Sequence, residues 1–397
     1  MRLASLIEKK YLVYKGFAST SALLFAFIYS NSLGVVNRSI VTYIFVLSTL
    51  IWIVLTSGST LTLRKIQPDF ASVEMRSFLS LAFAQTLIGI LIFILGLQIY
   101  SLTIVEIPQN LYFLSCIYFL ASGLALLLIE IQISQLGYIF AAKMEFLAVF
   151  SQFLIFEVIR RFSSLSISVS LFLGFTASYS IISILLLKNL DFHLIRTLKP
   201  NNPIYFWKLT KGNHTVGVSI AILDRLDKIF IAYFFPIGAL APYSILCSLI
   251  STLRFIPDYA SRLIISYNIS SLSKFSIYKT PILTLSIPIF FLFAFSSQKL
   301  IVLLLGDEWI LPLSIGFFVA VQEFTRAFFQ IQLNRLVLLE RVLWKKYIPL
   351  LSIFFTILSV YLLANAYGLI GVPIAFSIVY GVTSVLTLLG GRMWSNP

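Results

Sequence analysis

The stretch Ser219-Ile-Ala-Ile-Leu-Asp-Arg-Leu-Asp-Lys-Ile-Phe-Ile-Ala-Tyr-Phe-Phe235 places four ionisable residues in the middle of an apolar segment. These residues are Asp224, Arg225, Asp227 and Lys228. A charge near the centre of a membrane-spanning helix costs about 2.5–3.5 kcal/mol on insertion scales. Such residues persist where they face other protein or a watery cavity rather than lipid. The stretch therefore predicts a helix inside a bundle that has a polar interior.

The composition of the whole chain agrees with a membrane protein. Hydrophobic residues make up 59% of the 397 residues and charged residues only 11%, whereas a soluble domain carries about 25% charged residues. Apolar runs recur along the chain, and each is long enough to cross a hydrocarbon core of about 30 Å. We expect an all-α, polytopic integral membrane protein.

We expect twelve membrane spans in two lobes of six helices around a central cavity, a plan common among transporters. The longest polar stretch, 188–213, is basic and separates an N-terminal lobe, 1–187, from a C-terminal lobe, 214–397. The expected spans are residues 14–29, 40–56, 78–100, 111–129, 138–159, 166–187, 214–235, 239–265, 281–305, 309–332, 347–366 and 369–389.

The net charge of +14 indicates an orientation in the membrane rather than binding to nucleic acid. Most basic residues fall in alternate segments between spans, and no compact basic face or RNA-binding signature is present. Cytoplasmic segments of membrane proteins are enriched in Lys and Arg. The expected outward segments hold only Arg38, Arg160, Arg161 and Lys299. This bias predicts that both termini lie in the cytoplasm.

Polar residues recur on one side of the expected span 309–332. Gln322, Arg326 and Gln330 are spaced four residues apart, which places them on one helix face, and Glu323 lies beside them. Lipid would not tolerate this stripe, so it should face the bundle or water.

Two further ionisable residues, Arg254 and Asp258, flank Pro257 in the expected span 239–265. A proline within a span can bend the helix and free carbonyl groups near a cavity. Asp258 fits an interfacial position equally well.

Two interpretations of the charges in 219–235 remain open. Asp224 and Lys228 are four residues apart and Arg225 and Lys228 three apart, so each pair can touch on a helix face. The group can be a self-paired cluster that fixes helix packing, or it can line a path for a substrate or an ion.

Catalysis is not indicated by the sequence. Nucleotide-binding, metalloprotease and nucleophile-elbow motifs are absent, and the outward loops are too short for a catalytic domain. Cys116 and Cys247 lie in expected spans as small apolar residues, and His193 and His214 have no cysteine nearby with which to hold a metal. We expect no enzyme activity, no cofactor and no metal site.

Several short motifs carry a resemblance to a family of transporters. Asp224-Arg-Leu-Asp-Lys-Ile-Phe-Ile-Ala-Tyr-Phe, followed by Tyr243-Ser-Ile, resembles the span-seven signature of bacterial polysaccharide flippases. Leu33-Gly-Val-Val, Leu305-Gly-Asp-Glu-Trp309 and Tyr367-Gly-Leu-Ile-Gly-Val-Pro-Ile-Ala375 match further points of the pattern. The motifs are loose individually, but their order runs from end to end of the chain. Pro242 departs from the pattern, because the family more often has Gly there, and leaves the local geometry of that span open.

The resemblance implies an O-antigen or capsule repeat-unit flippase of the multidrug, oligosaccharidyl-lipid and polysaccharide exporter superfamily. Such a protein moves an undecaprenyl-pyrophosphate-linked oligosaccharide to the periplasmic leaflet of the bacterial inner membrane, through a cavity that is often cationic. The partners that the resemblance implies are membrane lipids, a polysaccharide polymerase and a chain-length regulator. The implied cationic candidates are Arg225, Lys228, Arg254 and Arg326. The candidates for charge balance or ion coupling are Asp224, Asp227, Asp258 and Glu323.

Other functions are compatible with parts of the pattern. A cation-coupled multidrug antiporter of the same superfamily would favour unpaired acidic residues in the N-terminal lobe, where Glu130 and Glu145 are the deep ones. The lipid II flippase branch usually has two more spans. A polysaccharide polymerase is polytopic too, but it would be expected to carry a large outward loop.

Overall fold

The computed structural model describes residues 2–65, 68–136, 138–188, 203–254, 272–338 and 342–393, and the described residues are almost entirely helical. The chain divides into two compact units, Met1–Ala221 and Ile222–Pro397. The division falls inside one continuous helix, α7 (Pro203–Phe234). This helix begins within the stretch expected to be a linker.

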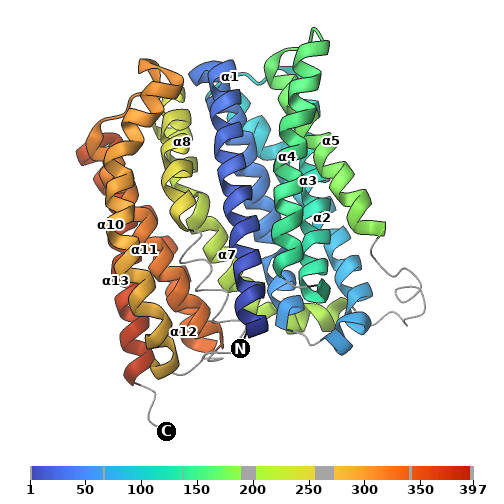
Figure 1. The fold of residues 1–397 in the computed structure, drawn as a ribbon, viewed down its shortest axis with the longest axis vertical. Helices are drawn as coiled ribbons and strands as arrows, with labels where there is room; N and C mark the ends of the chain where they lie inside the picture. The colour runs from blue at the N-terminus through green and yellow to red at the C-terminus, as the bar shows by residue number, and fades with distance from the viewer. Residues whose placement is uncertain are drawn as a thin grey trace. The chain divides into compact units, whose positions relative to one another are not determined.

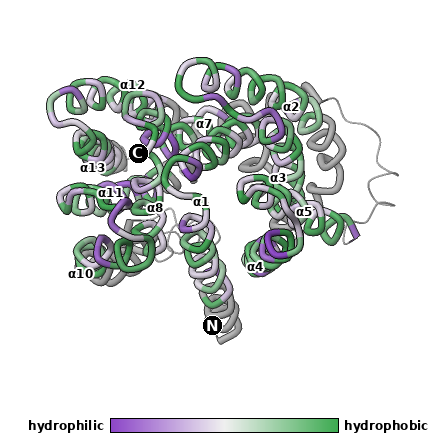
Figure 2. Tube along the Cα trace, turned by 90° about the horizontal axis from the view of Figure 1, so that it is seen from above, coloured by the Kyte–Doolittle hydropathy of each residue, from purple (hydrophilic) through white to green (hydrophobic). Residues whose placement is uncertain are grey.

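Unit 1 is a helical bundle in which α1 packs against α2, α3 and α4, and α5 packs against α3 and α4 (Figure 1). Most of its helices are hydrophobic along their length (Figure 2), as expected for helices that face lipid or one another. Its helices before α7 are α1 (Arg2–Lys65), α2 (Pro68–Thr103), α3 (Gln109–Leu136), α4 (Tyr138–Phe162) and α5 (Ile167–Lys188).

The first helix, α1, contains two membrane spans joined by a sharp turn at Gly34. The backbone there has φ 70° and ψ 169°, a combination that essentially only glycine adopts. Phe25 and Phe45 both contact the ring of Phe175, with ring centroids 5.7 Å and 4.9 Å away. Twenty residues of straight helix would hold these two rings about 30 Å apart. The chain therefore reverses at Gly34, between the first two expected spans.

A tryptophan fixes the packing of α1 on α3. The Trp52 indole occupies the space where a side chain at Gly123 would lie, because a Cβ built there would be 1.5 Å from the ring. The Trp52 Nε1–H donates a hydrogen bond to the carbonyl of Phe119 (2.9 Å). This bond satisfies the polar atom of a large buried side chain.

In unit 2, α11 packs against α10 and α13, α12 packs against α13, and α8 packs against α10 and α11. Short 3₁₀ turns connect several of these helices: Ile237–Ala239, Thr252–Arg254, Asp307–Trp309 and Gly368–Ile370. The α-helices that follow α7 are α8 (Leu240–Ser251), α10 (Leu272–Leu305), α11 (Leu313–Leu338), α12 (Val342–Tyr367) and α13 (Gly371–Met393).

The fold class expected from the sequence is confirmed, since each of the twelve expected spans overlaps a helix. Two details differ. Trp309 does not begin α11, because it lies buried in a 3₁₀ turn and Pro312 directly precedes the helix. Pro242 does not disturb α8, because it lies in the first turn of the helix, where a missing N–H breaks no helical hydrogen bond. The part of the eighth expected span from 255 onward lies outside the described residues.

Within the described residues, six stretches are long and apolar enough to cross a membrane. Two of them each hold a pair of helices joined by a turn. α4, α7 and α11 are not among the six, and they carry ionisable residues. The six stretches are Val13–Ser57, Leu81–Thr103, Gln109–Ile131, Ile167–Lys188, Pro288–Leu305 and Tyr347–Leu388. The chain is a multi-pass membrane protein.

The turn at Gly34 provides a test of the hairpin. Gly34→Ala should destabilise the protein by about 1–3 kcal/mol, because the backbone conformation disfavours any L side chain. Gly16→Ala is the matched control, because both positions have open space for a Cβ and only Gly34 has a positive φ. Thermal unfolding in detergent should show a lower Tm for Gly34→Ala and an unchanged or higher Tm for Gly16→Ala. Equal Tm values for the two variants would contradict the turn.

Candidate functional site

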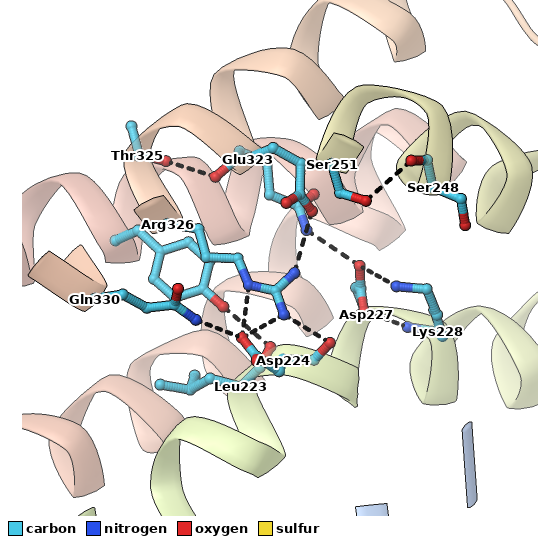
Figure 3. Close-up of polar contacts among 12 residues, drawn as sticks. Leu223, Asp224, Asp227, Lys228, Ser248, Ser251, Glu323, Thr325, Arg326 and Gln330 are labelled. Carbon is cyan, nitrogen blue, oxygen red and sulfur yellow. Dashed lines mark hydrogen bonds and ion pairs between the residues drawn. The ribbon is translucent and has the colours of Figure 1, made fainter. Parts of the chain in front are cut away.

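A buried polar cluster lies in unit 2, where the second half of α7 meets side chains of α8, α11 and α13 (Figure 3). We call it the polar network. It contains Leu223 (through its carbonyl), Asp224, Asp227, Lys228, Tyr243, Gln322, Glu323, Arg326, Gln330 and Tyr380. Its residues come from helices far apart in sequence, so the network joins these helices within the apolar bundle.

Arg326 of α11 is one centre of the polar network (Figure 3). Its Nε donates a hydrogen bond to the Asp224 carboxylate (2.6 Å), and its Nη2 donates to the Asp224 carbonyl (2.9 Å). Its Nη1 donates to the Glu323 carboxylate (3.1 Å). The side chain is only 5% exposed. All three guanidinium nitrogens are therefore engaged by α7 or by the preceding turn of α11.

Asp227 of α7 is the second centre of the polar network. One carboxylate oxygen accepts hydrogen bonds from Gln322 Nε2 (3.1 Å) and from the Tyr243 hydroxyl (3.3 Å). The other oxygen accepts the backbone N–H of Lys228 (2.8 Å), and Lys228 Nζ lies 3.6 Å from the carboxylate. Asp227 is fully buried. Its carboxylate is thus contacted by one cation and by donors from three helices.

The Tyr243 hydroxyl has two acceptors and one proton. It lies 3.3 Å from the Asp227 carboxylate and 3.1 Å from Gln322 Oε1. A phenolic hydroxyl has a single hydrogen to donate, so it can serve only one of these acceptors at a time. Asp227, Tyr243 and Gln322 therefore form a closed triangle of hydrogen-bonding groups.

Two further contacts attach α7 to its neighbours. The Tyr380 hydroxyl of α13 donates to the carbonyl of Leu223 (3.0 Å). Gln330 Nε2 donates to the Asp224 carboxylate (3.2 Å). Tyr380 in turn packs on Phe329, with ring centroids 5.6 Å apart. The polar stripe of α11 thus faces protein, as its spacing predicts.

The electrostatics of the polar network depend on pairing. Isolated charges in a low-dielectric interior are strongly disfavoured, and removing one partner of a buried pair costs about 3–5 kcal/mol. Here three carboxylates, those of Asp224, Asp227 and Glu323, meet the cations Arg326 and Lys228. The cationic groups in the network are thus held against acidic ones.

The predicted site residues fall into three groups. The structure brings together Asp224, Asp227, Lys228, Gln322, Glu323, Arg326 and Gln330. Arg225 is partly buried on the same helix. Arg254 ends a 3₁₀ turn, but its side chain and the whole of Asp258 lie outside the described residues. Whether any of them binds substrate stays a prediction.

The sequence pattern missed some features of the network. It suggested pairing within 219–235, whereas Asp224 pairs with Arg326 of another helix. The motif that contains Tyr243 does not predict its contact with Asp227, and no pattern in the sequence predicts the contact that Tyr380 makes. Tyrosines in apolar helices carry little signal, because their rings also fit a lipid-facing or core position.

Unit 1 holds charged contacts of its own. Lys15 of α1 forms an ion pair with Glu145 of α4. Arg38, expected in an outward segment, is 4% exposed within α1. Its guanidinium lies 4.4 Å from the Tyr29 ring centroid, and its Nε donates to the Ser30 hydroxyl (3.0 Å). Among the described residues, no carboxylate lies within ion-pair distance of Arg38.

Among the described residues, no three His, Cys, Asp or Glu side chains converge as they would around a metal ion. The sequence matches no protein-family model. No curated protein matches it in sequence.

Solved structures of a lipid flippase and of MATE transporters are similar to this fold. A structure of the lipid II flippase MurJ in an inward closed conformation matches with a TM-score of 0.67 and 13% identity, over 96% of this chain and 86% of MurJ. A variant of the Vibrio cholerae MATE transporter VcmN matches with a TM-score of 0.66 and 11% identity, over 99% and 98%. A eukaryotic MATE transporter matches with a TM-score of 0.66 and 14% identity, over 98% and 96%.

These likenesses concern the fold, because the coverage is nearly complete and the identities are low. The chain shares its α-helical, multi-pass fold with the lipid II flippase MurJ and with MATE transporters.

The pairing of Arg326 can be tested by stability. Arg326→Ala should lower the free energy of unfolding by about 3–5 kcal/mol, because it leaves two carboxylates without their cation in a buried site. The matched control is Arg160→Ala, which removes an Arg–Glu pair of the same i,i+3 spacing from an exposed position. Exposed pairs contribute at most about 1 kcal/mol.

Thermal unfolding in detergent and the amount of protein in membranes measure both effects. A loss for Arg326→Ala no larger than for Arg160→Ala would show that the buried pairing does not support the fold.

Proposed function

We propose that this protein is a flippase that carries a lipid-linked oligosaccharide, an O-antigen or capsule repeat unit on undecaprenyl pyrophosphate, from the cytoplasmic to the periplasmic leaflet. The observation that carries the proposal is the fold, since it is shared with a lipid II flippase. The motif pattern of polysaccharide flippases, with Asp224-Arg-Leu-Asp-Lys at its centre, adds the class of glycan lipid.

The contacts in the polar network support different roles for the different cationic candidates. Arg326 uses its three nitrogens on Asp224 and Glu323. A diphosphate could reach this guanidinium only by displacing those carboxylates, which would break both ion pairs. We assign Arg326 to holding α7 against α11, and Lys228 to offsetting the charge of Asp227 on its own helix. Arg225, partly exposed on the same helix, is the candidate for contacting the diphosphate, because guanidinium groups bind phosphate oxygens in a bidentate manner.

Rigid attachment of α7 suits a transporter. Alternating access in such folds proceeds largely by rigid-body rocking of helix bundles. A bundle that moves as a body needs contacts that do not slide, and hydrogen bonds between buried charges are directional in a way that apolar packing is not. The polar network would give α7, α8, α11 and α13 this rigidity.

A second candidate is a cation-coupled multidrug antiporter. The likeness to MATE transporters has nearly the same TM-score as the likeness to MurJ. The network also contains three carboxylates, those of Asp224, Asp227 and Glu323. An acidic group that accepts and releases a proton or a sodium ion would serve such an exchanger. A polysaccharide polymerase is a weaker alternative, because the solved structures that share this fold include flippases and transporters.

Complementation tests the proposed function. A bacterial strain that lacks its own repeat-unit flippase would receive this gene together with its native repeat-unit pathway, and surface polysaccharide would be measured by blotting. We expect the wild type to restore polymer. Arg225→Ala should reduce polymer at normal membrane abundance, and Arg225→Lys should retain part of it because the charge is kept.

The matched control is Lys299→Ala, which removes an exposed cation of α10 in the same unit and should leave polymer unchanged. If Arg225→Ala restores polymer fully, Arg225 is not the diphosphate contact. If the wild type restores no polymer and confers drug resistance instead, the protein is an antiporter and the flippase proposal is wrong.

A further inference from the structure

A cavity of about 500 Å³ lies in unit 1, where three turns of the bundle meet. These are the Gly34 turn of α1, the loop 104–108 between α2 and α3, and the loop 163–166 between α4 and α5. Its volume is within the range of about 300–1,000 Å³ that is typical of small-molecule sites. The polar residues that line it are Ser32, Asn37, Glu106, Asn110, Ser166 and Ser168.

The walls of this cavity are held by local hydrogen bonds. In the loop 104–108, the N–H of Ile104 donates to the Tyr100 carbonyl (2.9 Å) and the N–H of Ile107 donates to the Ser101 hydroxyl (3.2 Å). Ile107 is buried, so it anchors the loop next to Glu106. On the opposite wall, Ser166 Oγ accepts the N–H of Val169 (3.4 Å) at the start of α5. These hydrogen bonds hold in place the loop backbone that carries the polar side chains of the cavity.

The lining retains unused capacity to accept hydrogen bonds. Asn37 uses its amide N–H on the Leu33 carbonyl (3.2 Å), which leaves its carbonyl oxygen. Ser32 donates to the Ile28 carbonyl (3.1 Å) and keeps its lone pairs. Within the described part of the chain, the Glu106 carboxylate has neither a hydrogen bond nor an ion pair, and the residue is exposed at the cavity mouth.

The lining also retains donors. Asn110 uses its carbonyl oxygen on the N–H of Leu111 (2.8 Å), which leaves its amide hydrogens. Ser166 accepts a bond and keeps its own hydroxyl hydrogen. Leu33, Val105 and Pro108 lie between these polar groups. The cavity therefore offers donors, acceptors and apolar surface together.

This chemistry selects among ligands. The only ionisable group among the lining residues is Glu106, so phosphates and uronic acids would meet a negative charge in the lining. One carboxylate is also a poor set of ligands for a divalent ion, which prefers several charged oxygens. A neutral or amino sugar presents hydroxyl groups that both donate and accept, and C–H faces that pack on apolar side chains.

We propose that this cavity is a binding site for neutral or amino sugars. The proposal rests on the proposed function, because the sugars would belong to the glycan of the transported lipid. It also rests on the predicted orientation. All three turns lie at the end of the bundle opposite to the N-terminus of α1, which faces the periplasm if the termini are cytoplasmic. The cavity then holds the glycan on the side where it arrives.

Binding of monosaccharides to the purified full-length protein in detergent tests this site. Saturation-transfer NMR would use N-acetylglucosamine, glucose and glucuronate as probes. We expect signals from the two neutral sugars and at least several-fold weaker signals from glucuronate. Glu106→Gln should weaken binding of the neutral sugars by about tenfold, since a hydrogen bond to a charged acceptor is replaced by a neutral one.

A second variant tests the cavity without changing its polar groups. Val36→Trp should abolish the signals by filling the cavity, because Val36 is an exposed lining residue. Val158→Trp is the matched control, because Val158 is similarly exposed on α4 and outside the lining. Absence of binding by the wild type, or equal binding by Val36→Trp and Val158→Trp, would overturn the proposal.

The complementation assay separates this inference from the proposed function. If the wild type restores polymer but binds no sugar at the cavity, the flippase proposal is supported and the sugar-site proposal is wrong. Sugar binding that Val36→Trp abolishes, without restored polymer by the wild type, would support the site and refute the flippase.

Discussion

The Arg326 guanidinium between Asp224 and Glu323 is the interaction on which unit 2 depends most. It is almost completely buried, so its charge is tolerable only while both carboxylates are in place. Each of its three nitrogens also has a defined partner, which fixes the rotation of α7 relative to α11. Apolar side chains alone would allow these helices to slide in register, because the hydrophobic effect has no direction.

The distribution of polar residues among the helices follows from the need to pair buried charges. Helices whose faces meet lipid or apolar protein, such as α2, α3 and α5, satisfy the composition expected of membrane spans. α7 and α11 do not, because each devotes one face to the network. In unit 1 the helices are joined by aromatic packing. The Trp52 ring fills the space beside Gly123, and Phe175 contacts rings from both arms of α1.

Much of the fold could be predicted from the sequence, because hydrophobic runs of spanning length are a strong and local signal. The helical class and the approximate limits of the spans follow from it. The polar stripe of Gln322, Arg326 and Gln330 could also be predicted, since its spacing is that of one helix face. The helix that contacts this stripe could not be predicted. Which helix faces which is set by contacts between distant residues, and nothing in the local pattern of Asp224 specifies Arg326 rather than Lys228. The cavity near Glu106 was equally hidden, because it is formed by three turns whose residues are unremarkable one by one.

The Tyr243 hydroxyl, with two acceptors and one proton, gives the site two hydrogen-bonding arrangements. In one arrangement the proton points to the Asp227 carboxylate, and in the other it points to Gln322 Oε1. Gln322 Nε2 donates to Asp227 in both. The two arrangements differ by the rotation of one O–H bond, so the number of hydrogen bonds that Asp227 accepts can change while the heavy atoms that attach α7 stay in place.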